Sequence, residues 1–270
     1  MVEKDVVRGS TSVRTRESLT SDLTRLGIQA GGVLIIHSSL KAVGWIAGGP
    51  AAVLHALSDV VTSSGTLVMP AQSQDLTDPV RWENPSVPAE WHDEIRRSMP
   101  AYDRERTPTR DMGRIAELFR TWPGVLRSDH PTSSFAAWGS AAETVVSEHP
   151  LNDPFGEASP LAKLYDLDAK VLLLGVAFEA CTALHLAERR AWPDQQTVPE
   201  GSPMMVNGTR SWVQYETPLL RTDLLEEAGE HLMGVDLVRS GPVGSARSHL
   251  VPLRSLVDTA ACRWRSERFH

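Results

Sequence analysis

One histidine of this chain has a carboxylate at the spacing that acid–base chemistry requires. In the segment Leu184-His185-Leu186-Ala187-Glu188, the two groups stand three residues apart, so on a helix they share one face. An imidazole titrates near neutral pH, and a carboxylate that fixes its tautomer makes it a better general base. The spacing is equally compatible with a satisfied core histidine beside a solvated glutamate. One such pair supplies too few ligands for zinc, so no metal is predicted.

Small residues follow three predicted strands, in His37-Ser38-Ser39, Met69-Pro70-Ala71 and Gly241-Pro242-Val243-Gly244. Ligands of open α/β sheets bind beyond the carboxyl ends of the strands, where exposed backbone N–H groups suit a phosphate or a thioester oxygen. None of these turns is a Walker or dinucleotide fingerprint, and ordinary turns are the alternative. Ser38 and Ser39 lie outside a Gly-x-Ser-x-Gly elbow, so a hydrolase nucleophile is not supported.

The elements that must position these residues follow an α/β pattern. Continuous apolar runs at 33–36, 66–69 and 170–176 predict strands buried on both faces, and the helical patterns between them predict parallel pairing. A helix begins near Ser18 and stops at Gly27. In the C-terminal half, Asn207-Gly208 predicts a hairpin, followed by a helix over 219–233, a strand over 235–238 and a last helix from about Leu253.

These elements predict one α/β domain with a mixed, largely parallel central sheet covered by helices. Residues 1–16 are polar and aperiodic and are expected to form a flexible N-terminal arm, and residues 17–270 form the domain. The stretch 71–109 is rich in Pro and Trp and is expected to be largely irregular. Long insertions of this kind are usually functional.

Composition narrows the class of partner. The 270 residues carry a formal charge of −7, which disfavours non-specific nucleic-acid binding and favours cationic substrates. No window reaches the roughly 18 apolar residues of a membrane helix, and the N-terminus lacks a secretory pattern. Two cysteines, Cys181 and Cys262, cannot build a disulfide framework, so a cytoplasmic protein is expected. Whether the chain is a monomer or a homodimer is left open.

Seven strings, in order, resemble those of the aminoglycoside 3-N-acetyltransferase (antibiotic N-acetyltransferase) family. The set comprises His37-Ser38-Ser39-Leu40-Lys41-Ala42-Val43-Gly44 with Gly48-Gly49-Pro50, Gly65-Thr66-Leu67-Val68-Met69-Pro70, Arg127-Ser128-Asp129-His130-Pro131, Phe155-Gly156-Glu157-Ala158-Ser159-Pro160, Val171-Leu172-Leu173-Leu174-Gly175-Val176, Thr182-Ala183-Leu184-His185-Leu186-Ala187-Glu188 and Gly241-Pro242-Val243-Gly244. The resemblance spans about residues 18–265. Each string alone is weak, but seven in order are specific.

The resemblance implies an acetyl-CoA-dependent enzyme that acetylates the 3-amino group of a 2-deoxystreptamine aminoglycoside and thereby gives antibiotic resistance. It also implies a fold distinct from that of histone-type N-acetyltransferases and no metal. By this resemblance His185 is the general base, and its orienting carboxylate is Glu216 in Gln214-Tyr215-Glu216. Glu188 then becomes a supporting residue on the helix face.

Ligand contacts are implied in the same way. Coenzyme-binding residues are expected at His37, Ser38, Ser39, Lys41, Val68, Met69, Pro70, Gly241, Val243 and Gly244. Carboxylates that face the cationic aminosugar are expected at Asp75, Asp78, Glu94 and Glu179.

The chain departs from the family pattern at the entrance to the His185 helix. Relatives often read acid-x-Asn-Thr-Ser there, whereas this chain reads Glu179-Ala180-Cys181-Thr182-Ala183 and loses two hydrogen-bonding side chains. The alternatives are therefore an acyl-CoA-dependent N-acyltransferase of another amine or aminosugar, and a non-catalytic CoA-binding relative.

Overall fold

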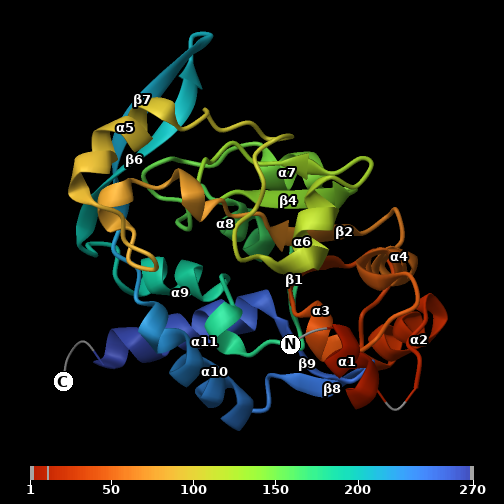
Figure 1. Cartoon of the computed structure of the whole chain (residues 1–270). Coiled ribbons are helices and arrows are strands. Elements are labelled where there is room, and N and C mark those ends of the chain that lie inside the picture. Colours follow the sequence, from red (N-terminus) through yellow and green to blue (C-terminus); the bar gives the residue numbers. More distant parts are fainter. Residues whose placement is uncertain (1–2, 11, 268–270) are drawn as a thin grey trace.

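A seven-stranded sheet runs through the middle of the computed structural model, which describes residues 3–10 and 12–267 (Figure 1). Its strands are β1 (Val33–Ser38), β2 (Thr66–Pro70), β3 (Leu126–Arg127), β4 (Phe135–Gly139), β5 (Lys170–Leu174), β8 (Arg239–Val243) and β9 (Ala246–Pro252). They lie in the order β3-β4-β2-β1-β5-β9-β8. β1 pairs in parallel with β2 and β5, and the outer pairings are antiparallel. The predicted α/β class with a mixed sheet is confirmed.

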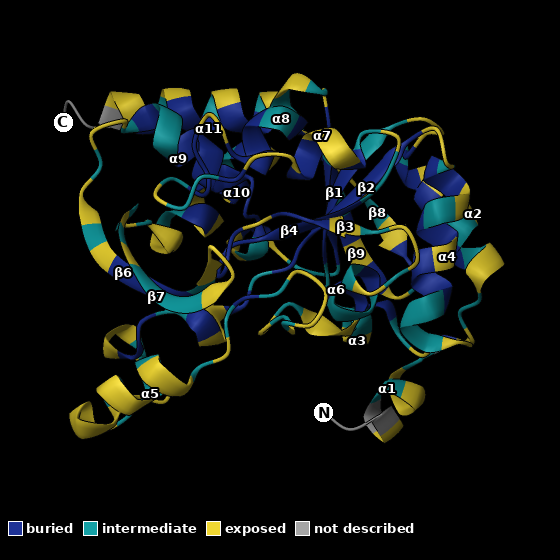
Figure 2. Cartoon of the chain, turned by 90° about the horizontal axis from the view of Figure 1, so that it is seen from above, coloured by how far each residue is buried: buried dark blue, intermediate teal, exposed yellow. Residues whose placement is uncertain are grey.

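Helices cover both faces of this sheet because alternate residues of the central strands point to opposite sides. Ile35 packs into one apolar cluster, and its neighbours Leu34 and Ile36 pack into the other. The first cluster includes residues of α7 (Ala142–Val146), α8 (Pro160–Asp166), α9 (Leu184–Ala191), α10 (Leu225–Gly234) and α11 (Leu253–Glu267). The second includes residues of α2 (Arg16–Leu26), α3 (Leu40–Val43), α4 (Gly49–Val61) and α6 (Gly113–Arg120). Figure 2 shows α8, α9 and α11 together, apart from α2 and α4.

Local sequence explains where α2 begins and ends. Thr15 accepts a hydrogen bond from the Ser18 N–H, and the Ser18 hydroxyl accepts one from the Thr15 N–H, which is a capping box. Gly27 ends the helix with φ 106°, a left-handed conformation that glycine adopts without strain. Between these caps, Leu19 and Leu23 are buried. The predicted helix is therefore confirmed.

The N-terminal arm is more regular than predicted. Residues Glu3–Gly9 form α1, and the Ser10 hydroxyl accepts a hydrogen bond from the Trp45 N–H at 3.0 Å. Arg14 forms a parallel β-bridge with Ile46. The aperiodic sequence of this arm did not predict α1, and the flexibility of residues 1–16 stays a prediction.

The predicted hairpin is confirmed and is longer than its sequence signal. It consists of β6 (Thr197–Val206) and β7 (Thr209–Pro218), and Val206 pairs with Thr209 across the turn. Both turn residues have positive φ, 50° at Asn207 and 78° at Gly208, as a type I′ turn requires. The hairpin projects beyond the main sheet (Figure 1).

Two C-terminal expectations need correction. The stretch predicted as a strand over 235–238 is irregular, and the strand β8 begins at Arg239. The helix expected over 219–233 divides into η5 (Thr222–Leu224) and α10. Gly241 and Val243 therefore lie within a strand instead of a turn.

The insert, residues 71–109, contains only short helices. These are η1 (Gln74–Leu76), η2 (Pro79–Arg81), η3 (Ala89–Trp91) and α5 (His92–Ser98). It lies against the hairpin, where the Tyr102 N–H donates to the Pro203 carbonyl at 2.8 Å and the Arg210 Nε donates to the Met99 carbonyl at 3.2 Å. Across the two described ranges, no helix has the length and apolar character needed to span a membrane.

Candidate active site

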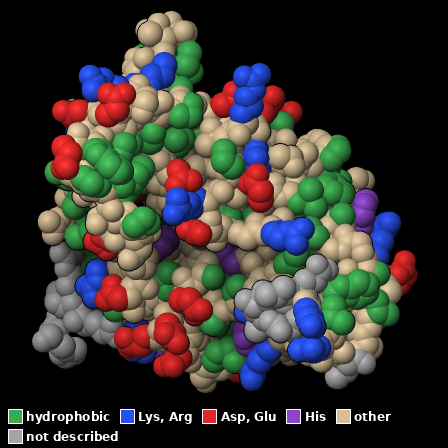
Figure 3. Space-filling model, viewed as in Figure 1, with side chains coloured by type: hydrophobic (Ala, Val, Ile, Leu, Met, Phe, Trp, Pro, Cys, Tyr) green, Lys and Arg blue, Asp and Glu red, His purple; other side chains and the backbone are tan. Residues whose placement is uncertain are grey.

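The predicted general base lies in a cavity beyond the carboxyl end of β1. His185, on α9, and His37, on β1, both line this cavity of about 350 Å³, which we call the histidine cavity. Its lining is Ile36, His37, Ser38, Pro70, Gln72, Asp111, Met112, Ala116, Val176, Glu179, Ala180, Thr182, His185, Thr222 and Leu225. Segments far apart in the sequence therefore build one site. Figure 3 shows histidine side chains in the hollowed middle of this face, with acidic side chains on its borders.

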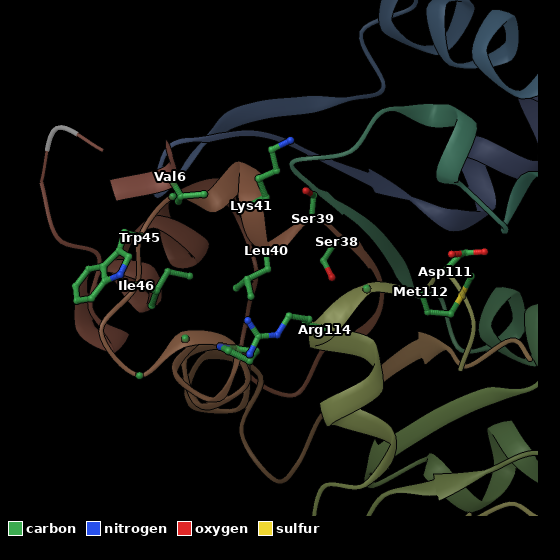
Figure 4. Close-up of a pocket in the computed structure, with 15 residues that line it drawn as sticks. Val6, Ser38, Ser39, Leu40, Lys41, Trp45, Ile46, Asp111, Met112 and Arg114 are labelled. Atoms are coloured by element: carbon green, nitrogen blue, oxygen red, sulfur yellow. The ribbon is translucent and has the colours of Figure 1, made fainter. Parts of the chain in front are cut away.

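A second, larger cavity adjoins the first. Its volume is about 730 Å³, and it shares Ser38, Asp111 and Met112 with the histidine cavity. We call it the large cavity; its other lining residues are Val6, Ser39, Leu40, Lys41, Gly44, Trp45, Ile46, Gly48, Gly49, Pro50, Gly113 and Arg114. Figure 4 shows Trp45 and Val6 toward one end, Asp111 and Met112 at the other, and the cationic side chains of Lys41 and Arg114 between them.

His185 and Glu188 form a buried pair. The imidazole Nδ1 lies 2.9 Å from the Glu188 Oε2, and the residues are 6% and 1% exposed. A carboxylate accepts hydrogen bonds, so Nδ1 carries the proton and Nε2 is the nitrogen with the free lone pair in the neutral ring. The Phe155 ring lies 5.2 Å from the imidazole, centroid to centroid. This arrangement suits a general base whose tautomer is fixed.

The expected pairing of His185 with Glu216 is wrong. Glu216 is an exposed residue of β7, paired in register with Pro199 of the hairpin. The carboxylate on the imidazole is Glu188, because a helix places residues three apart on the same face at contact distance. The choice depends on where the hairpin lies, which the sequence pattern does not specify.

His37 is a neutral neighbour of this pair. Burial lowers the pKa of His37 to about 3, and the charge that His185 carries when protonated acts in the same direction. Its buried Nε2 has no hydrogen-bond partner among the described residues. A ring that stays uncharged does not compete with His185 for the proton of a substrate.

The expected coenzyme residues divide into three groups. Ser38, Ser39 and Lys41 line the large cavity, whereas His37 and Pro70 line the histidine cavity. The prediction for Val68 and Met69 is wrong, since both are fully buried core residues of β2.

The prediction for Val243 is also wrong, whereas Gly241 and Gly244 are partly exposed and line neither named cavity, so their role stays a prediction. Val243 is 1% exposed within the core, and Gly241 pairs with Ser248 inside the β8–β9 hairpin. Gly244 packs so tightly that a Cβ there would lie 2.6 Å from the Val43 carbonyl oxygen. The residue of this hairpin that lines a cavity with Lys41 is Ser245. The position of Ser245 depends on the register of β8 and β9, which the sequence pattern does not specify.

The expected substrate-facing carboxylates are scattered. Glu179 lines the histidine cavity, whereas Asp75 lines a separate cavity of about 300 Å³ and is ion-paired with Arg110. The prediction is wrong for Asp78, which is 8% exposed, bonds to Arg96 at 2.8 Å and caps η2. Glu94 pairs with Arg97 at 2.6 Å on the exposed helix α5 and lines none of the cavities described, so its role stays a prediction.

Two charged residues of the site have no signal in the sequence pattern. Asp111 lines the histidine cavity, the large cavity and the Asp75 cavity, and its side chain is 85% exposed. Its φ of 58° is uncommon for a residue other than glycine, although aspartate tolerates it better than most. Arg114, at the start of α6, adds a second cation to the large cavity.

The donors of the large cavity fit a coenzyme that carries phosphates. Lys41 and Arg114 supply two cations, and Ser38 and Ser39 supply hydroxyl and backbone groups near the end of β1. Arginine forks bind phosphate oxygens well, and lysine acts as a point charge. The shared wall at Ser38 places the inner end of this cavity next to His185, where a reactive group of the coenzyme would be needed.

Comparisons with known proteins show which family the chain resembles. A family model described as aminoglycoside 3-N-acetyltransferase matches residues 35–264. In Bacillus subtilis (strain 168), the SPbeta prophage-derived aminoglycoside N(3')-acetyltransferase-like protein YokD is 47% identical over 258 residues, 95% of this chain and 94% of that protein. The crystal structure of YokD matches with a TM-score of 0.96 at 45% identity, over 98% of each chain.

Two solved relatives hold ligands. AAC-IIIb, solved as a binary complex with CoASH, is 32% identical, with a TM-score of 0.83 over 95% of this chain and 98% of that one. AAC-VIa bound to sisomicin is 29% identical, with a TM-score of 0.85 over 95% of this chain and 99% of that one. These matches confirm the expected distinction from the histone-type fold. The chain belongs to the aminoglycoside 3-N-acetyltransferase family.

Proposed function

We propose that this protein transfers an acetyl group from acetyl-CoA to the 3-amino group of a 2-deoxystreptamine aminoglycoside. The observation that carries the proposal is the buried His185–Glu188 pair, in a cavity that adjoins the cationic large cavity. Solved relatives with CoASH and with sisomicin support the two ligand classes.

The residues divide the chemistry between them. An ammonium group must lose a proton before its nitrogen can attack, and the Nε2 of His185 takes that proton, directly or through a water. Glu188 holds the ring through Nδ1 and stabilises the imidazolium that forms. When bound, acetyl-CoA supplies the electrophilic thioester carbonyl, whose C–S bond breaks as the C–N bond forms, so that the coenzyme leaves as the free thiol. Lys41 and Arg114 hold its phosphates. No covalent acyl-enzyme is required.

Charge favours a cationic acceptor. Glu179 and Asp111 both line the histidine cavity, so their carboxylates can hold ammonium groups of the acceptor other than the one that reacts. The ion pair between Asp111 and the Arg110 Nε is long, at 3.4 Å, and leaves Asp111 able to make this contact. Cys181 and Ala183 are fully buried and are absent from the lining of the histidine cavity.

The test is thiol release from acetyl-CoA with a panel of 4,6- and 4,5-disubstituted aminoglycosides, followed by mass and NMR spectra of each product. We expect one added acetyl group, on N3 of deoxystreptamine, and loss of turnover in His185→Ala with the fold intact. Turnover of another amine only, or of a longer acyl-CoA only, would favour the alternative N-acyltransferase. Coenzyme binding without single-turnover transfer to any amine would refute an enzymatic role.

The role in antibiotic resistance has a separate test. Expression in a susceptible host should raise the inhibitory concentration of each drug that is acetylated in vitro. His185→Ala is the control, and equal protection by this variant would refute resistance by acetylation.

A further inference from the structure

The catalytic carboxylate is itself held by a side chain outside the histidine cavity. Glu188 is 1% exposed, and one of its oxygens, Oε2, bonds to His185. The other oxygen, Oε1, accepts a hydrogen bond from the Gln195 Nε2 and another from the Arg221 backbone N–H at 2.7 Å. A buried carboxylate needs such donors, because desolvation otherwise opposes its charge.

The orientation of the Gln195 amide follows from its partners. Arg189 donates from Nη1 to the Gln195 Oε1 at 3.1 Å, and arginine can only donate. Glu188 can only accept when ionised, so the NH₂ group must face it. The second hydrogen of this NH₂ group bonds to the Leu219 carbonyl. Every polar atom of the amide thus has a partner, and a flipped amide would break at least two of these bonds.

Arg189 is fixed in turn. Its Nε donates to the Asp153 Oδ1 at 3.0 Å, and its side chain is 15% exposed. The hydrogen bonds therefore run from Asp153 through Arg189 and Gln195 to Glu188 and end at the imidazole of His185.

Gln195 lies on a different surface from the substrate groups. It lines a separate cavity of about 580 Å³ with Trp192, Trp264 and Arg221. The segment after the hairpin divides the two spaces, since Thr222 and Leu225 line the histidine cavity and Arg221 and Leu224 line the other. Gln195 is absent from the linings of the histidine cavity and the large cavity, so it reaches the reaction only through Glu188.

We propose that Gln195 is a positioning residue of the transferase, which locks the Glu188 carboxylate so that its Oε2 keeps the Nδ1 proton of His185. This inference rests on the proposed function, because it assigns a role in the same reaction. The charged groups around His185 and Glu188 are Arg189 of α9 and Arg221 after β7 with its partner Asp223, and the titratable but neutral group is His37 of β1. Of these, only Arg189 bonds to the Gln195 side chain.

The first test is a kinetic comparison of Gln195→Met with Gln196→Met. Methionine keeps the length of glutamine and removes its donors and acceptor. Gln196 is the exposed neighbour of Gln195 and lines the same cavity. Within the described residues it donates none of the hydrogen bonds that Glu188 accepts, so it serves as the control. We expect Gln195→Met to lower kcat by about ten- to a hundredfold, the loss typical of one hydrogen bond to a charged group, with KM for acetyl-CoA unchanged. Gln196→Met should stay within about twofold of the wild type.

A double-mutant cycle decides whether Gln195 acts through Glu188. In a Glu188→Gln background, Gln195→Met should change kcat by less than about twofold, because the Arg221 N–H still holds the amide oxygen and His185 is already in the tautomer that cannot act as the base. A full, independent loss in both backgrounds would show a general structural effect and overturn the proposal. Equal rates for Gln195→Met and the wild type would also overturn it.

A spectroscopic readout separates this proposal from the proposed function. In the free, isotope-labelled protein, the Nδ1–H of His185, assigned by its loss in His185→Ala, should exchange with water at least about tenfold faster in Gln195→Met. An unchanged exchange rate refutes the positioning role, whatever the enzyme acetylates. A wild type that acetylates no amine refutes the proposed function and leaves this measurement valid.

Discussion

Replacing Glu188 by glutamine tests which nitrogen of His185 is free to take a proton. The Oε1 position of Glu188 receives two donors, the Gln195 NH₂ group and the Arg221 N–H. In Glu188→Gln, the amide oxygen of the new side chain must therefore occupy that position, and its NH₂ group must face the Nδ1 of His185. The imidazole can accept this bond only with its proton on Nε2. The variant thus blocks the nitrogen that serves as the base.

The expected loss follows from this change of tautomer. A histidine base held in the wrong tautomer by an amide loses about 10³- to 10⁴-fold in kcat, equivalent to about 4–5 kcal/mol of transition-state stabilisation. The substitution preserves the volume of a side chain that is 1% exposed, so the fold and the KM for acetyl-CoA should be retained. The assay is initial-rate thiol release at saturating acetyl-CoA, with thermal unfolding as the check on the fold.

Glu216→Gln is the matched control. It makes the same change in an exposed residue of β7, and it should leave kcat within about twofold of the wild type. The reasoning is refuted if Glu188→Gln retains more than about a tenth of the wild-type kcat, or if Glu216→Gln is damaged to the same extent.

The charges and buried histidines of the protein lead to three further predictions. Arg114→Ala should raise KM for acetyl-CoA about tenfold with kcat retained, because it removes a cation of the large cavity. The same thiol-release assay measures this, and an unchanged KM would show that the phosphates bind elsewhere. Asp111→Asn should raise KM for a polycationic acceptor about two- to fivefold. The increase should disappear in high salt, because the Asp111 side chain is largely exposed and its charge is screened. An increase that does not depend on salt would contradict a charge contact. Burial lowers the pKa of His37 to about 3, that of His130 to about 4 and that of His149 well below its usual range, so the unfolded chain binds more protons below about pH 6.5. The contribution of these groups to stability is therefore complete above that pH and should fall at about pH 5, by about 2 kcal/mol for each of His37 and His130, which denaturant unfolding at neutral and acidic pH would detect. Equal stability at both pH values would contradict the burial of neutral rings.

Local signals in the sequence were sufficient for much of the fold. The apolar runs that became β1, β2 and β5 are continuous because these strands are covered on both faces. The strands β3 and β4 were not predicted, because β3 has two residues and β4 reads Phe-Ala-Ala-Trp-Gly, without β-branched residues. The place of β4 beside β2 is set by long-range pairing, and β3 pairs with β4 at the edge of the sheet.

The sequence by itself determined two local features, the turn of the hairpin and the contact between His185 and Glu188. Asn207-Gly208 specified its turn because both residues tolerate positive φ, and the spacing of His185 and Glu188 specified their contact because helix geometry is local. Only the tertiary structure decided that Glu188 is the partner of the imidazole and Glu216 is not. The site residues Asp111 and Arg114, and Gln195 behind Glu188, were also recognised only in the tertiary structure. Their neighbours come from distant parts of the chain, and contacts at such sequence separation depend on how whole elements pack, which no local pattern encodes.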